Sequence, residues 1–239
     1  MTKFEILFGI KETEIQKTCV LLPLLAKDML SNLGIKKLSR GKLYSSGQAQ
    51  DLTVIVTGIG AGLAGDAVLY LEETACQDII LFGSCGLVEP KRDLGIGSLV
   101  SPLLSYSLES FSGMLLDKTK GWRAFPSDKG FMERFLNVAG ENEIQKVRCA
   151  TLGSLKLEEG SVDLFREKDI DVVDMECSSV FSASRHIKKK VMALFYITDI
   201  INKKPFYIKL GIEDRLRLSS SIKTAARAIC KSTKNSLTS

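Results

Sequence analysis

The sequence predicts an α/β fold: a single domain over residues 1–239, in which a mostly parallel central mixed sheet lies between helices on both faces as a three-layer sandwich. Two observations lead to this prediction. Short β-rich runs alternate with longer helical patterns along the whole chain, and the strongest strand candidates are almost continuously apolar. Strands of that kind are buried on both faces, which requires helices above and below the sheet. No repeat, low-complexity stretch or linker divides the 239 residues.

The N-terminal half alternates between the two kinds of element. Residues 4–9 form an apolar run that ends in glycine, which is typical of a strand. A helix is expected over 12–30, because apolar residues recur there at helical spacing. Residues 52–57 and 78–82 are rich in Val, Ile and Leu and predict strands, with a helix over 62–74 between them.

The C-terminal half continues the alternation after one irregular stretch. A strand is expected at 98–101, whereas 103–126 is the least regular segment and is interpreted either as a functional lid or as an unstructured loop. A helix over 129–139 begins behind Asp128, a good capping residue. The remaining expected elements are strands at 146–151, 171–174 and 191–197, and helices at 159–168, 177–187 and 212–231.

Composition excludes several classes of function. The net charge is only +5, and the basic run at 185–190 has no interleaved aromatic residues, so nucleic-acid binding is not expected. The six cysteines lie far apart without a Cys-x-x-Cys pair, which argues against zinc, iron–sulfur and disulfide frameworks. We expect no cofactor. No run of about 18 apolar residues and no signal-peptide core is present, so a cytoplasmic protein without a membrane partner is expected.

Glycines follow three of the expected strands, at Gly9, 58–62 and 83–86. In an open parallel sheet, ligands bind beyond the carboxyl ends of the strands, so these turns are candidate binding sites. Residues 60–65 also match the G-x-G-x-x-G pattern of dinucleotide-binding folds, but no acidic residue ends the following strand to hold a ribose. These glycines are therefore interpreted as serving tight turns and close packing, in preference to a nicotinamide or flavin site.

Carboxylates also gather after the expected strands. Glu12 and Glu14 follow Gly9, Asp174 and Glu176 follow the apolar strand residues Val172 and Val173, and Asp199 follows the strand at 191–197. Each alone could cap a helix. Together they predict a cleft lined by carboxylates. Cleavage of a glycosidic bond needs such a cleft, because its transition state resembles an oxocarbenium ion and is stabilised by negative charge.

The ordered set of motifs resembles the nucleoside phosphorylase/nucleosidase superfamily across nearly the whole chain. The resemblance implies a nucleoside phosphorylase-like sandwich, a purine-type nucleoside as substrate, and a homodimer or higher homo-oligomer. Four segments carry it, namely Thr57-Gly58-Ile59-Gly60, Phe82-Gly83-Ser84-Cys85-Gly86, Val173-Asp174-Met175-Glu176 and Tyr196-Ile197-Thr198-Asp199.

The resemblance also implies a role for individual residues. Asp199 would protonate N7 of the purine and make the base a better leaving group. Glu176 would accept hydrogen bonds from the ribose hydroxyls while Met175 packs on the sugar, and Gly83 and Ser84 would belong to a substrate-binding turn. A carboxylic acid can do the work of Asp199 only if burial raises its pKa, which the apolar strand before it allows.

Water and phosphate remain alternative attacking groups, with hydrolysis favoured. The loop at 9–14 resembles that of methylthioadenosine/S-adenosylhomocysteine nucleosidases, in which the last glutamate, here Glu14, activates water. Leu81 stands where hexameric phosphorylases carry a phosphate-binding arginine. In a phosphorylase, however, Gly9 and an Arg40 lent by a neighbouring subunit would hold phosphate.

The substrate is less clearly indicated than the reaction. Adenosine-type nucleosidases carry an aromatic residue that stacks on the base, and the corresponding position falls near Lys156 and Leu157. Because no aromatic residue stands at this position, the sequence does not identify the base or the 5′ substituent of the nucleoside. Futalosine hydrolases, which share the fold, are a further alternative, and so is a non-catalytic nucleoside-binding protein.

Overall fold

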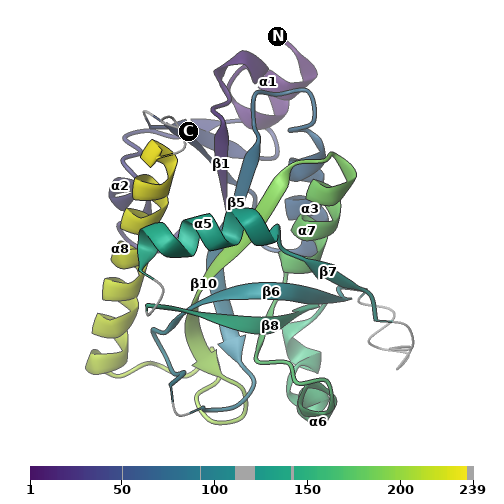
Figure 1. Cartoon of the computed structure of the whole chain (residues 1–239), viewed down its shortest axis with the longest axis vertical. Helices are drawn as coiled ribbons and strands as arrows, with labels where there is room; N and C mark the ends of the chain where they lie inside the picture. Colours follow the sequence, from purple (N-terminus) through teal and green to yellow (C-terminus); the bar gives the residue numbers. More distant parts are fainter. Residues whose placement is uncertain (50, 92, 111–121, 141–142, 236–239) are drawn as a thin grey trace.

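The computed structural model describes all residues except 50, 92, 111–121, 141–142 and 236–239 (Figure 1). The strands are β1 (Thr18–Leu22), β2 (Ser39–Arg40), β3 (Ser45–Gln48), β4 (Leu52–Val56), β5 (Asp78–Leu87), β6 (Leu99–Leu108), β7 (Ala124–Pro126), β8 (Ile144–Leu152), β9 (Val172–Asp174) and β10 (Lys190–Ile200). The helices are α1 (Lys3–Phe8), α2 (Met29–Asn32), α3 (Ala61–Leu69), α5 (Lys129–Ala139), α6 (Val162–Glu167), α7 (Cys177–His186) and α8 (Ile212–Asn235). Three short 3₁₀ turns are η1 (Glu12–Glu14), η2 (Leu155–Leu157) and η3 (Glu159–Ser161).

The strands form one mixed sheet in the order β10-β6-β8-β9-β5-β1-β4-β3-β2, with β7 paired to β6. Because β10 also pairs with β5, the strands β5, β10, β6, β8 and β9 close into a ring. The run β4-β1-β5-β10 is parallel, and so is β6-β8-β9; antiparallel pairs join these two runs and form the β2–β3 edge. The predicted α/β class with a mixed central sheet is confirmed.

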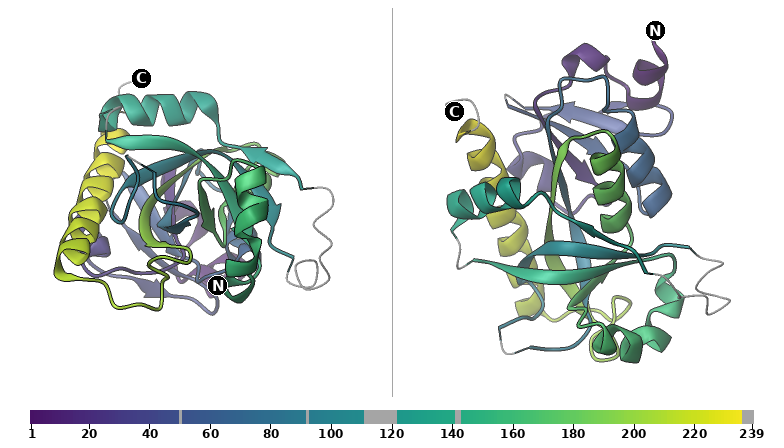
Figure 2. Two further views of the ribbon diagram at one scale, coloured as in Figure 1. Left: turned by 90° about the horizontal axis from the view of Figure 1, so that it is seen from below. Right: turned by 45° about the vertical axis from the view of Figure 1, so that its right-hand side comes forward.

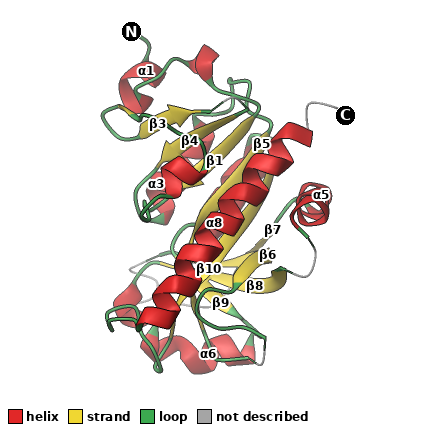
Figure 3. Ribbon diagram, turned by 90° about the vertical axis from the view of Figure 1, so that its left-hand side faces the viewer, coloured by secondary structure: helices red, strands yellow, loops and turns green. Residues whose placement is uncertain are grey.

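Helices cover both faces of the sheet, as its alternating side chains require. Along β5, Ile79 and Leu81 pack in the cluster that contains α3 and α7, whereas Ile80 and Phe82 pack in the cluster that contains α2, α5 and α8. Figure 2 shows α8 and α5 along one side of the strands and α7 along the other, and Figure 3 shows α8 lying across the sheet. The result is a three-layer arrangement with two apolar interfaces.

The prediction for the N-terminal 30 residues is wrong. Residues 4–9 form helix α1, in which Phe4 and Phe8, one turn apart, stack with ring centroids 4.2 Å apart. The expected helix over 12–30 instead contains β1, all of whose residues are buried. An unbroken apolar run fits a buried strand and a buried helix equally well, so periodicity alone could not separate them.

Most other elements are confirmed, with shifted ends. Helix α5 covers the predicted residues, and the Asp128 carboxylate accepts the Phe131 N–H at 2.7 Å as a cap. The irregular segment at 103–126 contains the second half of β6 and the strand β7, while 111–121 lies outside the described residues. Strands β2 and β3 were not predicted. No described helix is long and apolar enough to cross a membrane.

Candidate active site

A pocket of about 400 Å³ lies where the ends of β5, β9 and β10 meet. Its walls are largely apolar, and the ionisable side chains among its described lining residues are four carboxyl groups and one thiol. Within the part of the chain that the structure describes, no Lys, Arg or His lines it. The lining residues are Pro23, Leu24, Ile59, Leu152, Leu155, Val173, Met175 and Phe206, the small or polar Ser84, Cys85, Gly86 and Thr198, and the acidic Glu158, Asp174, Glu176 and Asp199.

Asp199 reaches the pocket from an irregularity in β10. The register between β10 and β5 shifts between Ile197 and Asp199, and Asp199 then lies opposite Gly86. A Cβ on Gly86 would be 3.0 Å from the Asp199 carboxylate, so a larger residue there would displace that side chain. Asp199 is buried, and the Thr198 hydroxyl donates to its Oδ1 at 2.7 Å. Burial raises the pKa of Asp199, and the Thr198 hydrogen bond opposes that rise.

The segment Gly83-Ser84-Cys85-Gly86, predicted as a turn after a strand, is instead the second half of β5. The strand continues because it pairs with β10 through this segment. Ser84 lines the pocket, whereas Gly83 lies beneath it, with the Pro23 ring 3.6 Å from where a Cβ would stand. The small residues therefore serve close packing inside a strand as well as access to the pocket.

Glu176 and Met175 enter the pocket where β9 passes into α7. Asp174 holds this junction, because its Oδ2 accepts the backbone N–H groups of Glu176 at 2.9 Å and Cys177 at 2.6 Å. Glu176 Oε1 accepts the Gly60 N–H at 2.6 Å. The Gly58–Gly60 turn therefore supports a carboxylate instead of presenting a free anion site. Burial first, and the Asp174 charge second, raise the pKa of Glu176.

Glu158 is a pocket residue that the sequence analysis missed. It lies between η2 and η3, is buried, and lines the pocket together with Leu155. The predicted stacking residues Lys156 and Leu157 do not line it. Burial first and the Asp199 charge second raise the pKa of Glu158 to about 8. Leu155 and Glu158 are three residues apart, which is the spacing that a single helical turn places on one side.

Glu14, Gly9 and Arg40 do not join this pocket within one chain. Glu14 is exposed in η1, where its Oε2 accepts the Lys11 N–H at 2.7 Å. Gly9, at φ +77°, ends α1, and a Cβ on it would stand 2.8 Å from the backbone of exposed Arg40. Their grouping with Asp199 rested on a strand at 4–9 that does not exist. The loop that follows the true first strand supplies Pro23 and Leu24 instead.

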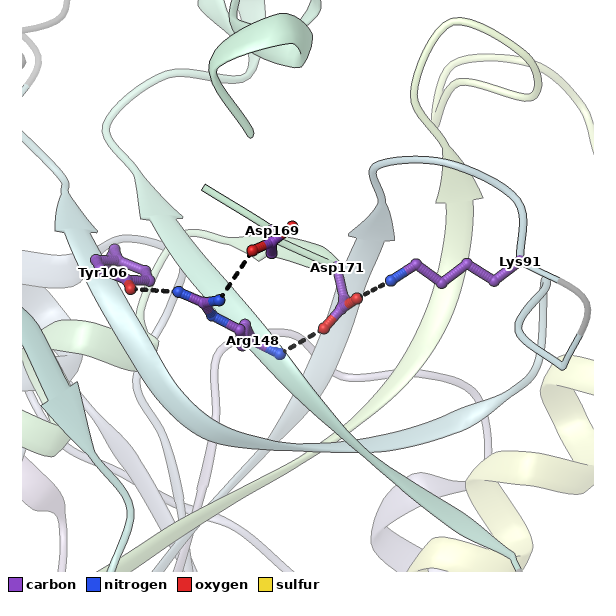
Figure 4. Close-up of polar contacts among 5 residues, drawn as sticks. All are labelled: Lys91, Tyr106, Arg148, Asp169 and Asp171. Carbon is purple, nitrogen blue, oxygen red and sulfur yellow. Dashed lines mark hydrogen bonds and ion pairs between the residues drawn. The ribbon is translucent and has the colours of Figure 1, made fainter. Parts of the chain in front are cut away.

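A polar network anchors the start of β9, at the opposite end from the pocket residues (Figure 4). The Asp171 carboxylate pairs with Lys91 and accepts the Arg148 backbone N–H at 2.7 Å. The Arg148 guanidinium donates to the Tyr106 hydroxyl at 2.6 Å and pairs with Asp169 at 3.4 Å. These contacts tie the segment before β9 to β8 and β6, and so fix the strand from which Asp174 projects.

Comparison with known proteins identifies the family of the chain. A family model described as "Phosphorylase superfamily" matches residues 21–234. The chain belongs to the phosphorylase superfamily. Its motif-based recognition and its predicted enzyme class, N-glycosidase or nucleoside phosphorylase, are thereby confirmed.

Solved structures of three superfamily members illustrate the shared fold. A methylthioadenosine/S-adenosylhomocysteine nucleosidase of Campylobacter jejuni has a TM-score of 0.71 at 17% identity, covering 92% of this chain and 99% of its own. A uridine phosphorylase of Vibrio fischeri has a TM-score of 0.74 at 16% identity, covering 95% and 94%. A purine nucleoside phosphorylase of Toxoplasma gondii has a TM-score of 0.73 at 17% identity, covering 98% and 99%. Among curated proteins, none matches this sequence.

Proposed function

We propose that the chain is a hydrolase that cleaves the N-glycosidic bond of a purine-type nucleoside and releases the free base and the sugar. One observation carries the proposal. A single pocket with largely apolar walls brings the carboxyl groups of Asp199 and Glu176 together, with no cationic residue among its described lining. Placed carboxyl groups assist departure of the base and stabilise the positive charge that develops on the sugar.

Each residue has a part that its position supports. Asp199, whose pKa is raised by burial, donates a proton to the purine as the bond to the sugar breaks. Glu176, with one oxygen held by the Gly60 N–H, presents its other oxygen to the ribose hydroxyls. Met175 packs on the sugar, and Ser84 offers a hydroxyl beside it.

The charge of the pocket favours water over phosphate as the attacking group. Four carboxyl groups line it, and phosphate, which is anionic at neutral pH, would have to enter without a described cation to pair with. Water carries no charge, and the proton it releases can pass to a pocket carboxylate. Glu14 lines a different hollow and lies outside this pocket, so a pocket carboxylate, and not Glu14, activates the water.

The apolar part of the pocket favours a nucleoside with an uncharged 5′ substituent, such as a methylthioadenosine- or adenosylhomocysteine-like thioether. Leu24, Ile59 and Phe206 line the pocket and are 51%, 54% and 57% exposed, so they surround its opening. All six cysteines are free thiols, which fits the cytoplasm as the place of the reaction.

The same exposed side chains support a homo-oligomer. With Leu63, they leave large apolar groups exposed near the pocket, a pattern typical of protein interfaces. Light scattering coupled to size-exclusion chromatography tests this. A mass above one chain of 26.3 kDa is expected, and a monomer at all concentrations would contradict it.

The reaction is tested by measuring the release of free base from methylthioadenosine, adenosylhomocysteine, adenosine, inosine and futalosine, each with and without phosphate. Release without phosphate is the expected result and identifies the substrate. Release only with phosphate, yielding a sugar phosphate, would make the protein a phosphorylase and bring Arg40 of a neighbouring copy into consideration. Binding without release from any nucleoside would favour a non-catalytic nucleoside-binding protein.

A further inference from the structure

Glu158 is the one pocket carboxyl group to which neither the sequence analysis nor the proposed reaction gives a task. It is 5% exposed and stands between two 3₁₀ turns. Burying a carboxyl group is costly unless hydrogen bonds or a cation compensate it. Burial, followed by the charges of Asp199 and Glu159, raises the pKa of Glu158, and no hydrogen bond or cation among the described residues is a cause that lowers it. A costly and uncompensated group that lines a pocket is a candidate for function.

The Glu158 carboxyl group lies close to that of Asp199. A Cβ on Gly86 would lie 3.0 Å from Asp199 Oδ2 and 3.2 Å from Glu158 Oε1. The two carboxyl groups, from β10 and from the η2–η3 turn, thus approach the same point above β5. Only glycine leaves room there for both. The two carboxylate oxygens therefore lie close enough together for one heterocyclic base, or one water molecule, bound beside Gly86 to contact both.

The surroundings oppose ionisation of both groups at once. Among the described residues, the other ionisable groups that line the pocket are Asp174 and Glu176, at the β9–α7 junction, and the Cys85 thiol of β5, and none of these is cationic. Glu159 adds a further acid next to Glu158 in the chain. Two carboxyl groups that face each other without a cation hold one proton between them over a wide pH range.

The Thr198 hydroxyl is a hydrogen-bond donor to Asp199. Its oxygen lies 2.7 Å from Asp199 Oδ1 and 3.3 Å from the Cys85 carbonyl oxygen. A hydroxyl has one hydrogen, so it cannot donate to both acceptors at once. The shorter contact, in which the hydroxyl donates to Asp199 Oδ1, opposes the rise in the pKa of Asp199 but does not cancel it.

We propose that Glu158 and Asp199 form a two-carboxyl acid that shares one proton and delivers it to the departing base. The inference rests on the proposed hydrolysis, since it concerns the same site. The bond between sugar and base breaks with its electron pair going to the base, and the shared proton passes to the base nitrogen. The water oxygen then bonds to the sugar carbon, and the proton that the water releases restores the pair. The sum is addition of one water molecule across the glycosidic bond.

The first test is the pH dependence of kcat/KM for wild type and Glu158→Gln, with Glu159→Gln as the matched control. Wild-type activity should fall above about pH 8, when the pair loses its last proton. In Glu158→Gln, Asp199 lacks a negative neighbour and should lose its proton about one pH unit lower or more. Glu159 is exposed and lies outside the pocket, and its charge is the last of the three causes that raise the pKa of Glu158, so Glu159→Gln should move the alkaline limb less than Glu158→Gln does. An unchanged alkaline limb in Glu158→Gln would overturn the inference.

The second test does not need turnover. Infrared spectroscopy follows the C=O stretch of protonated carboxyl groups as pH rises. In Asp199→Asn, the titration of Glu158 should move to lower pH, because its charged neighbour is gone; Glu158→Gln identifies the band. A midpoint that stays the same in Asp199→Asn would show that the two groups do not share a proton. If no nucleoside is cleaved but this midpoint moves, the proposed function fails while the proton-sharing pair stands.

Discussion

The two ends of β9 carry aspartates in opposite electrostatic conditions. Asp171, just before the strand, pairs with Lys91 and accepts a backbone N–H from Arg148. Asp174, at the end of the strand, is buried beside Glu176, where it accepts hydrogen bonds but pairs with no cation among the described residues. Burial raises the pKa of Asp174, and its hydrogen bonds oppose that rise.

The difference separates carboxylates that stabilise the fold from carboxyl groups that are available for chemistry. A charge matched by a cation at the surface is satisfied before any ligand arrives. A group buried against other acids remains costly until a substrate, a proton or a developing positive charge compensates it. We therefore expect substitutions of the uncompensated carboxyl groups to change turnover, and substitutions of the paired carboxylates to change stability slightly or not at all.

The largest effect is expected at Asp199. Asp199→Asn keeps the size of the side chain but removes the proton donor, so kcat should fall by about 10²- to 10⁴-fold. The free base should still bind, since the pocket is intact, and calorimetric titration checks this. Turnover within a few-fold of wild type would remove Asp199 from the mechanism and would erase the distinction between the two kinds of carboxyl group.

A smaller but still measurable effect is expected on stability against pH. The Glu158 pKa rises from 4.5 to about 8 on folding, so between these values the folded chain holds a proton that the unfolded chain has released. The free energy of unfolding should therefore fall as pH rises through this window, by up to about 1.4 kcal/mol per pH unit for each such group.

Glu158→Gln isolates that contribution, because glutamine cannot ionise. Urea unfolding of wild type and variant between pH 5 and pH 9 should show the variant losing less stability as pH rises. Glu159→Gln, at the exposed neighbour, should stay closer to the wild-type curve, because the Glu159 charge is the last of the causes that raise the pKa of Glu158. Parallel curves for wild type and Glu158→Gln would mean that Glu158 is already ionised in the folded protein at neutral pH.

A still smaller effect is expected at the other end of β9. Asp171→Asn removes the ion pair with Lys91 but keeps an oxygen that can accept the Arg148 N–H. Because Lys91 is half exposed, the loss should be about 0–1 kcal/mol in the free energy of unfolding. Thermal unfolding measures it, and kcat/KM should match wild type. A loss of turnover comparable to that of Asp199→Asn would show that the network of Figure 4 takes part in positioning the site.

The sequence predicted the part of the site built on strands with unambiguous patterns. Asp174 and Asp199 lie near the ends of strands whose preceding residues are apolar, so their place at the sheet edge could be inferred. Asp199 and Glu176 accordingly line one pocket, together with Met175 and Ser84. Glu158 could not be found this way, because it lies in an irregular turn whose direction depends on tertiary packing.

The N-terminal residues were misjudged for a physical reason. Phe4 and Phe8 bury the same face of a short helix, but a six-residue helix offers too few turns to show a period. The five residues of β1 are buried on all sides and show no alternation. Because the first strand was predicted at residues 4–9 instead of at β1, the loop after it was expected around Glu14, whereas the loop that reaches the pocket follows Leu22.

Glu14 therefore offers the finest test of the contrast between satisfied and uncompensated carboxyl groups. Like Asp171, it is occupied at the surface, where it accepts the Lys11 N–H and helps to cap η1. Glu14→Gln keeps an acceptor for that hydrogen bond, so kcat/KM should stay within about two-fold of wild type, and stability within about 0.5 kcal/mol. Turnover assays of Glu14→Gln and Asp199→Asn under the same conditions compare the two variants directly. If Glu14→Gln instead loses turnover, η1 of one copy must reach the pocket of another, and dilution to monomer should then abolish wild-type activity.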